Sequence, residues 1–253
     1  MIHSFLLIGQ SNAAGRGFSS DVDAIDNCDK RIKVLRNGRW WPAYRPINPD
    51  RVTSGVCLAE SFAREYATAH PELEGVGIIP CADGGTCLNQ WMPGEVLFDN
   101  AVNNSRLAMR TSVIKGILWH QGESDCSDEK CAAYEEKFKV IMNALREELG
   151  NTDVPIIVGG LGDFLADFDS ENIQRNYKKV NEKLKRLGNE YRNCAFASAE
   201  GLGANPDNLH FSAKALLDFG ERYYEAFKPY DKMVDGEGKD LSIDAPKSAI
   251  ELL

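Results

Sequence analysis

Apolar positions along the chain gather in short continuous runs, separated by stretches in which apolar residues recur at helical spacing. The first run is Phe5-Leu6-Leu7-Ile8, and Gly9 ends it. Comparable runs cover residues 76–79, 113–119, 155–158 and 194–197. A strand made only of apolar residues is buried on both faces, which is typical of a parallel sheet covered by helices. The runs therefore predict five strands of one such sheet.

Between these runs, apolar residues recur every three or four positions, as in an amphipathic helix. The helices predicted in this way cover residues 56–69, 97–109, 131–149, 173–187 and 213–227. Because strand and helix alternate along the chain, we expect an α/β protein, a three-layer α/β/α sandwich around a central, mainly parallel five-stranded sheet. The first strand is expected near the middle of that sheet.

Two segments do not follow the alternation. Residues 31–36 alternate polar and apolar side chains, and Asn37-Gly38 is a typical hairpin turn into Arg39-Trp40-Trp41. We interpret residues 31–41 as a β-hairpin excursion on the surface of the main fold. Residues 231–253 are charged and weakly patterned, so we expect one domain over residues 1–230 followed by a C-terminal tail.

The composition is that of an ordinary folded protein. Of the 253 residues, 43% are hydrophobic and 26% are charged. The net charge of -9 argues against a nucleic-acid partner and against binding to an anionic membrane surface, because either favours a basic face. No apolar run approaches the length of a membrane span.

The seven cysteines bear on the redox compartment. The first residues lack the basic region and the separate apolar region of a signal peptide, and the number of cysteines is odd, so we expect reduced thiols in a cytoplasmic protein. Two pairs are close enough in sequence for loop disulfides, which is the alternative: Cys81 with Cys87, and Cys126 with Cys131.

Polar turns follow the predicted strands at the edge where a parallel sheet places functional residues. These turns are residues 9–12, 82–86, 120–125 and 161–164, and residues 207–210 follow the fifth strand. Because the carboxyl ends of parallel strands meet at one edge, we expect several of the turns to converge on one cleft. Ser11 lies in the first turn, where a short helix begins, and by itself it is either a helix cap or a nucleophile.

A serine nucleophile needs a base, and His210 is the best placed of the four histidines. It follows Asp207 by three residues, a spacing that lets the carboxylate hold one ring nitrogen while the other faces Ser11. The alternative is a capping aspartate and a surface histidine that open the last helix. The convergence of the turns favours the catalytic interpretation.

An acyl-transfer site also needs N–H donors for the oxyanion. Three turns supply candidates: the backbone N–H of Ser11, the N–H of Gly84 or Gly85, and the side-chain amide of Gln121. Glycine in the second turn lets the backbone approach a substrate closely. Gln10 and Asn12 flank the serine and are expected to shape its turn.

The third turn and the loop after the glycine turn carry further candidates. His120 and Glu123 are three residues apart, but no second cluster with zinc-like spacing occurs, so we expect no metal and a hydrogen-bonded scaffold instead. Trp91 lies in the loop after the glycine turn and is a candidate for stacking on a sugar ring. Ordinary core packing is the alternative for this indole.

Together the turns resemble the SGNH-hydrolase superfamily and, more narrowly, its carbohydrate-esterase branch of acetylxylan esterases and sialate O-acetylesterase-like proteins. The resemblance runs from residue 4 to residue 227 and rests on Gly9-Gln10-Ser11-Asn12, Gly84-Gly85-Thr86, His120-Gln121-Gly122-Glu123-Ser124 and Asp207-Asn208-Leu209-His210. It implies a flavodoxin-like fold and a serine esterase without a cofactor. It also implies an acetylated carbohydrate as substrate, from acetylxylan to an acetylated sialic acid.

The resemblance makes Ser11 the nucleophile, His210 the base and Asp207 the group that orients the base. The third block of the superfamily is usually Gly-x-Asn-Asp, whereas this chain has His-Gln-Gly-Glu, which fits the carbohydrate-esterase branch. Some members of that branch are thought to use this glutamate as the acid partner, so Glu123 competes with Asp207 for that role. An α/β-hydrolase fits less well, because its nucleophile follows several strands. A non-catalytic sugar-binding domain is the alternative from another class.

Overall fold

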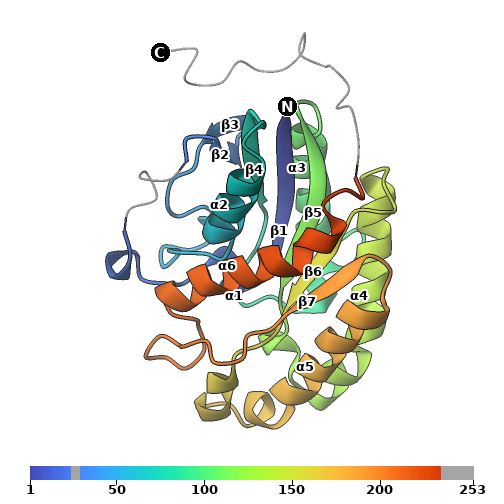
Figure 1. Ribbon diagram of the computed structural model, residues 1–253. Coiled ribbons are helices and arrows are strands. Elements are labelled where there is room, and N and C mark those ends of the chain that lie inside the picture. The colour runs from blue at the N-terminus through green and yellow to red at the C-terminus, as the bar shows by residue number, and fades with distance from the viewer. Residues whose placement is uncertain (24–28, 235–253) are drawn as a thin grey trace.

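A computed structural model describes residues 1–23 and 29–234, and the strands among them form one sheet in the order β3-β2-β4-β1-β5-β6-β7 (Figure 1). The strands are β1 (Ile2–Gly9), β2 (Ile32–Arg36), β3 (Arg39–Pro42), β4 (Gly75–Pro80), β5 (Ser112–His120), β6 (Ile156–Gly159) and β7 (Cys194–Ala197). The helices are α1 (Ser11–Ala14), α2 (Ala59–Ala69), α3 (Val96–Ala108), α4 (Asp128–Glu148), α5 (Glu171–Glu190) and α6 (Ala213–Phe227).

The first strand lies at the centre of the sheet, as predicted. β1 pairs in parallel with β4 on one side and with β5 on the other, and β6 and β7 continue the parallel sheet beyond β5. The four apolar residues of β1 at positions 5–8 are fully buried. Leu6 and Ile8 belong to the core on one face, and Phe5 and Leu7 to the core on the other, as expected of a strand with helices on both sides.

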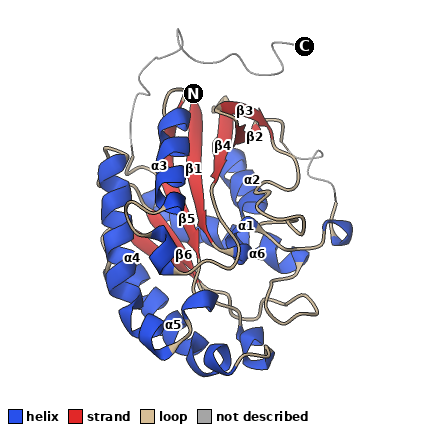
Figure 2. Cartoon of the chain, turned by 180° about the vertical axis from the view of Figure 1, so that it is seen from behind, coloured by secondary structure: helices blue, strands red, loops and turns tan. Residues whose placement is uncertain are grey.

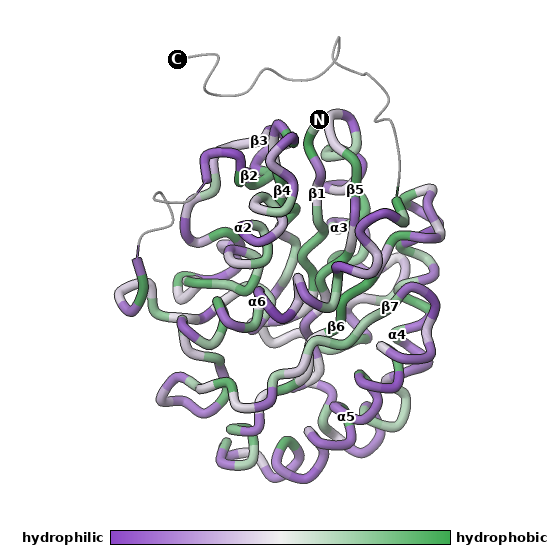
Figure 3. The backbone as a smooth tube through the Cα atoms, in the orientation of Figure 1, coloured by the Kyte–Doolittle hydropathy of each residue, from purple (hydrophilic) through white to green (hydrophobic). Residues whose placement is uncertain are grey.

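Helices cover both faces of the sheet and complete the three layers. α3, α4 and α5 pack on the face that Figure 2 shows in front, around Phe98, Phe138 and Leu184. α2 and α6 cover the opposite face, around Phe62 and Phe219. The central strands are largely hydrophobic, whereas α5 is mostly hydrophilic on its outer side (Figure 3). The predicted helices are confirmed with small shifts at their ends.

The hairpin of residues 31–41 is part of the main sheet, so the predicted surface excursion is wrong. β2 pairs in parallel with β4, with Ile32 opposite Val76 and Val34 opposite Ile78, and β3 adds an antiparallel edge. The sheet therefore has seven strands instead of five. An alternating pattern indicates that one face is buried, but it does not indicate which strand will be the neighbour, because that depends on tertiary packing.

The first residues of the predicted tail pack against the body of the protein. Lys115 Nζ donates a hydrogen bond of 2.6 Å to the carbonyl oxygen of Val234, and His70 Nε2 lies 2.9 Å from Asp231 Oδ2. The rest of that segment, residues 235–253, lies outside the described residues. None of the helices in the described part of the chain has both the length and the apolar character needed to cross a membrane.

Candidate functional site

The turns after several parallel strands meet at a cleft of about 350 Å³. Ser11 follows β1, Gly84 and Gly85 follow β4, Glu123 follows β5 and His210 follows β7, and all five residues line the cleft. The cleft thus lies at the carboxyl edge of the sheet, where parallel strands bring distant turns together.

Ser11, His210 and Asp207 form one hydrogen-bonded chain at this cleft. Ser11 Oγ lies 3.0 Å from His210 Nε2, and His210 Nδ1 lies 2.6 Å from Asp207 Oδ2. Ser11 is not a helix cap, because the N-cap of α1 is Gln10. Asp207 is not the cap of the last helix either, since Ser212 caps α6. The arrangement suits a nucleophile, a base and a carboxylate that orients the base.

Glycine at position 9 lets the first turn pass directly over the end of β5. The φ angle of Gly9 is +129°, and a Cβ atom there would lie 2.0 Å from the carbonyl oxygen of His120. The N–H of Gln10 donates to that same oxygen at 2.9 Å. The chain therefore turns sharply after β1, and Ser11 becomes the first residue of α1, where its N–H has no acceptor within the helix.

The second turn presents the N–H of Gly85, and not that of Gly84, as a donor at the cleft. Gly84 donates its N–H to Asp50 Oδ2 at 2.8 Å, and a Cβ atom on Gly84 would lie 2.5 Å from the guanidinium of Arg16. Within the described residues, no hydrogen-bond acceptor is found for the N–H of Gly85. Gly85 has a φ of +79° and no neighbouring atom within 4 Å of its Cβ position, so it borders open space.

Gln121 holds the turns together and does not line the cleft. Its side chain is fully buried, and its amide nitrogen approaches Gln10 Oε1, the Thr86 carbonyl oxygen and the Asp125 carboxylate. These acceptors occupy both N–H groups of the amide. The expectation that Gln121 donates to the oxyanion is therefore not supported by the geometry. Gln10 also links two turns, because its Oε1 accepts weak hydrogen bonds from backbone N–H groups of the third turn.

Glu123 lines the cleft but is not hydrogen-bonded to His210. Its Oε1 accepts a hydrogen bond of 2.5 Å from Asn12 Nδ2. Asn12 also donates to the carbonyl oxygen of Leu209 at 3.1 Å and accepts from the N–H of Phe211 at 3.1 Å, and these residues flank the histidine. Asn12 therefore ties the serine turn both to the third turn and to the loop that carries the base.

His120 and Trp91 belong to the core. His120 is fully buried, with Nε2 3.3 Å from Glu123 Oε1 and its ring against Phe211. Trp91 is also fully buried and donates its indole N–H to Thr86 Oγ1 at 3.1 Å. The expected stacking of Trp91 on a sugar is therefore wrong, because its ring has no exposed face. Among the described residues, no three His, Cys, Asp or Glu side chains are grouped as a metal site requires.

Hydrogen bonds hold the pKa values of both carboxylates down despite burial. Burial raises the pKa of Asp207, but hydrogen bonds from the side chain and the backbone of His210 outweigh burial, and the pKa lies below its usual value. Burial also raises the pKa of Glu123, and the hydrogen bonds from His120 and Asn12 bring that pKa below its usual value. Both groups are therefore anions at neutral pH.

The loop of residues 42–55 supports the second turn from outside. Asn48 exchanges two hydrogen bonds of 2.9 Å with the backbone of that turn. Asp50, which accepts the N–H of Gly84, also forms a buried ion pair with Arg16 through bonds of 2.7 and 3.0 Å. Sequence reasoning missed these residues, because only the fold brings the loop to the turn. The asparagine and aspartate in an otherwise irregular loop were the only local signal.

An apolar wall, which we define as Phe168, Ile173 and Leu209, lines the same cleft as Ser11 and His210. Its three side chains are partly buried and pack against the core. Phe168 follows the short helix η5 (Asp163–Asp167), and Ile173 lies in the first turn of α5. The sequence did not predict the wall, since no motif distinguishes an apolar residue of a cleft from one of the core.

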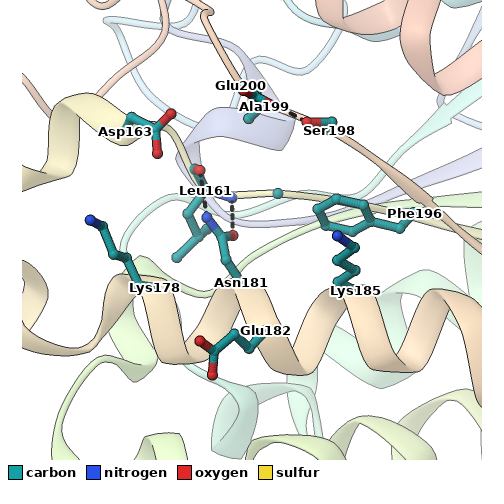
Figure 4. Close-up of a pocket in the computed structure, with 11 residues that line it drawn as sticks. Leu161, Asp163, Lys178, Asn181, Glu182, Lys185, Phe196, Ser198, Ala199 and Glu200 are labelled. Carbon is teal, nitrogen blue, oxygen red and sulfur yellow. Dashed lines mark hydrogen bonds between the residues drawn. The ribbon is translucent and has the colours of Figure 1, made fainter.

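A second cavity, of about 380 Å³, lies between α5 and the ends of β6 and β7 (Figure 4). Charged residues of both signs line it, namely Asp163, Lys178, Glu182, Lys185 and Glu200. Asn181 is hydrogen-bonded to the backbone of Leu161 in both directions, at 2.6 and 2.9 Å. Ser198 also lines this cavity, but no histidine is among its lining residues, so the cavity lacks a serine–histidine pair like that of the first cleft.

Comparisons of the sequence point to one family. Residues 1–229 match the sequence profile of a family described as carbohydrate esterase, sialic acid-specific acetylesterase. A protein of Arabidopsis thaliana that is named as a probable carbohydrate esterase is 28% identical over 242 residues. That match covers 88% of this chain and 89% of the Arabidopsis protein.

Solved structures share the fold. The X-ray structure of the Arabidopsis protein is similar with a TM-score of 0.79 and 27% identity, over 90% of this chain and 98% of that one. The crystal structure of NanS has a TM-score of 0.74 at 19% identity, over 92% and 98%. A carbohydrate acetylesterase from Xanthomonas citri has a TM-score of 0.65 at 17% identity, over 91% of this chain and 57% of its own. The last two are similar in fold.

Proposed function

The chain belongs to the family of carbohydrate esterases described as sialic acid-specific acetylesterases, and we propose that Ser11 carries its reaction through an acetyl-enzyme intermediate. Membership makes the protein a carboxylic ester hydrolase that acts on acetylated carbohydrates. The observation that carries the proposed mechanism is the chain of two short contacts, 3.0 Å from Ser11 to His210 and 2.6 Å from His210 to Asp207.

In the first half of the reaction, Ser11 Oγ attacks the carbonyl carbon of the acetyl group while His210 Nε2 takes the serine proton. The N–H groups of Ser11 and Gly85 stabilise the charge on the carbonyl oxygen. Asp207 accepts the Nδ1 proton, keeps Nε2 directed at the serine and stabilises the imidazolium. His210 then protonates the sugar oxygen, the ester C–O bond breaks, and acetyl-Ser11 remains.

In the second half, water replaces the deacetylated sugar. His210 Nε2 takes a proton from the water, whose oxygen attacks the acetyl carbon of the intermediate. The same two N–H groups stabilise the second oxyanion. His210 returns the proton to Ser11 Oγ as the bond between Oγ and the acetyl carbon breaks, and the acetic acid that leaves ionises to acetate. These residues carry both steps without help from a metal or an organic cofactor.

A neutral acetylated sugar, such as an acetylated xylose unit, is the substrate class that the charges favour. Arg16 is already paired with Asp50, and Arg51 with Asp83, each at 2.7 Å. Glu123 adds a buried negative charge to the wall of the cleft. The carboxylate of an acidic sugar would have to displace one of these ion pairs and would approach that charge. An acetylated sialic acid is therefore the second candidate substrate, and its hydrolysis is to be compared directly with that of the neutral sugar.

The test is acetate release from acetylated xylo-oligosaccharides and from an O-acetylated sialic acid, measured for the wild type and for Ser11→Ala. We expect Ser11→Ala to lower kcat by at least about 10³-fold with an unchanged circular dichroism spectrum. Ser198→Ala, which removes the serine of the second cavity, is the matched control and should keep full activity. Full activity of Ser11→Ala would refute the mechanism. A wild-type protein that binds the sugar without releasing acetate would favour a non-catalytic sugar-binding domain.

A further inference from the structure

We propose that the apolar wall of the cleft is the subsite for the ring of the departing sugar, with Phe168 packed against the apolar face of that ring. The proposal rests on the proposed function, because it states where the alcohol part of the ester binds. It names residues for substrate recognition that no sequence motif marks.

The strand order divides the cleft into two sides with different chemistry. Gly85 and Arg51 lie on the side of β4, where the backbone N–H and the paired arginines make a polar surface. Glu123 follows β5, which lies on the other side of β1, and Phe168 comes after β6, one strand farther out. The apolar wall therefore lies opposite the turn that supplies the oxyanion N–H.

The chemistry of the base decides which side receives the sugar. His210 Nε2 must reach the leaving oxygen to protonate it, while the carbonyl oxygen points at the oxyanion donors. The ring of the leaving sugar therefore lies on the side of His210. Leu209 of the wall directly precedes the base, and Phe211, which follows it, packs against Phe164 of η5 at a ring distance of 4.9 Å. This contact places the segment that carries Phe168 beside the base.

Phe168 is held in a defined position. Its carbonyl oxygen accepts hydrogen bonds from the N–H of Ser170 at 2.7 Å and from Gln174 Nε2 at 2.9 Å. Its side chain packs against the core and also lines the cleft. An aromatic ring on an anchored backbone, in a wall shared with two aliphatic side chains, suits the C–H face of a pyranose, which a more mobile residue would bind at a higher entropic cost.

Polar groups on the same side complete a sugar site. Ser124 lines the cleft next to Glu123. The second carboxylate oxygen of Glu123, Oε2, is buried and has no hydrogen-bond partner among the described residues. An anionic oxygen of this kind accepts a hydrogen bond from a hydroxyl group, which a sugar supplies. The apolar wall would then bind the face of the ring, and Glu123 one of its hydroxyls.

The experiment compares Phe168→Ala with the wild type on two acetyl esters that differ only in the alcohol. For an acetylated methyl xyloside we expect kcat/KM to fall about three- to tenfold, in line with the loss of one ring contact. For ethyl acetate, whose alcohol has no ring, we expect a change below about twofold on the same grounds. Phe168→Trp should retain activity on the sugar ester, and Phe168→Leu, which keeps an apolar side chain without a ring, should show most of the loss. Phe18→Ala, at a half-exposed phenylalanine outside the cleft, is the matched control and should leave both rates unchanged.

Equal losses on both esters would overturn the subsite, because they would mean that Phe168 only supports the catalytic turns. An unchanged rate on the sugar ester would overturn it as well. The two proposals fail differently. If Ser11→Ala keeps releasing acetate, the proposed mechanism is wrong. If Ser11→Ala is inactive while Phe168→Ala hydrolyses the sugar ester like the wild type, only the subsite is wrong.

Discussion

The two carboxylates near His210 have different surroundings. The side chain of Asp207 is 47% exposed and bonded to His210, whereas Glu123 is buried and bonded to Asn12. The sequence left both as candidates for the acid partner. The geometry supports Asp207 in that role and makes Glu123 a group that positions the third turn and lines the cleft.

This assignment predicts different outcomes for two matched substitutions. Asp207→Asn should lower kcat about 10- to 100-fold with little change in KM, because an amide stabilises the imidazolium poorly; the half-exposed carboxylate makes the loss smaller than in a buried triad. Glu123→Gln keeps an oxygen for Asn12 and should lower kcat by no more than about fivefold, while lowering the unfolding temperature. Steady-state kinetics and thermal unfolding test both variants. A larger loss of kcat in Glu123→Gln would contradict the assignment.

At the scale of elements, the loop of residues 42–55 and the second turn form one unit. Asp50 bonds to Arg16 and to the N–H of Gly84, while the neighbouring pair of Arg51 and Asp83 covers the same turn from the solvent side. The first pair is almost fully buried, and the second is a third to half exposed. The buried pair therefore fixes the position of the turn that carries Gly85, the proposed oxyanion donor.

Asp50→Asn should destabilise the fold far more than Asp83→Asn. Removing one partner of a buried ion pair leaves a buried charge and costs about 3–5 kcal/mol, whereas an exposed pair contributes about 0–1 kcal/mol. We also expect Asp50→Asn to lower kcat, since the second turn loses its anchor. Urea unfolding of the two variants measures the loss of stability, and steady-state kinetics measure the loss of kcat. Equal effects on stability would refute the view that the buried pair holds the turn.

The contribution of Asp50 to the stability of the fold depends on pH in a defined direction. Burial raises its pKa, but hydrogen bonds from Arg16 and Ser54 lower the pKa by more than burial raises it, so the pKa lies below the usual value. Such a carboxylate stabilises the fold above its unfolded pKa of about 3.9 and loses this effect as the pH falls through the folded pKa. The difference in unfolding free energy between the wild type and Asp50→Asn should be full near pH 7 and shrink below about pH 4. A difference in unfolding free energy that stays constant down to about pH 2 would contradict the stabilising role of the Asp50 carboxylate.

In the whole molecule, two apolar cores on the faces of the sheet enclose most of the thiols. The six described cysteines are free, and all but Cys87 are buried. Burial raises the pKa of Cys81 and of Cys194 to about 12, and it also raises the pKa of Cys57 and of Cys126. These thiols are therefore protonated and shielded in the folded protein.

The rate of alkylation should differ between Cys87 and the buried cysteines. With iodoacetamide near pH 8, the native protein should be modified at Cys87 and should resist modification at the five buried cysteines, because the thiolate is the reactive form. After unfolding in urea, all of them should react. Peptide mass mapping reports each cysteine separately. Modification of Cys57 or Cys194 in the native protein at the rate of Cys87 would show that the cores open more readily than their packing implies.

Local patterns were sufficient to predict five of the parallel strands and the helices between them. A strand buried on both faces must be apolar throughout, and residues 5–8, all fully buried, carry that requirement in the sequence itself. The pairing of Asp207 with His210 could be predicted for a similar reason, since three residues in one turn bring the two side chains together.

Only the tertiary structure decided which distant residues meet. Asn12 and Glu123 are 111 residues apart, and Asp50 and Gly84 are 34 residues apart, so no local spacing links them. The same holds for the pairing of β2 with β4, the burial of Trp91 and the apolar wall beside the base. A sequence carries the periodicity of each element, because periodicity is local. The neighbours of a buried amide or an edge strand follow from how complete elements pack, and that is settled only when the chain has folded.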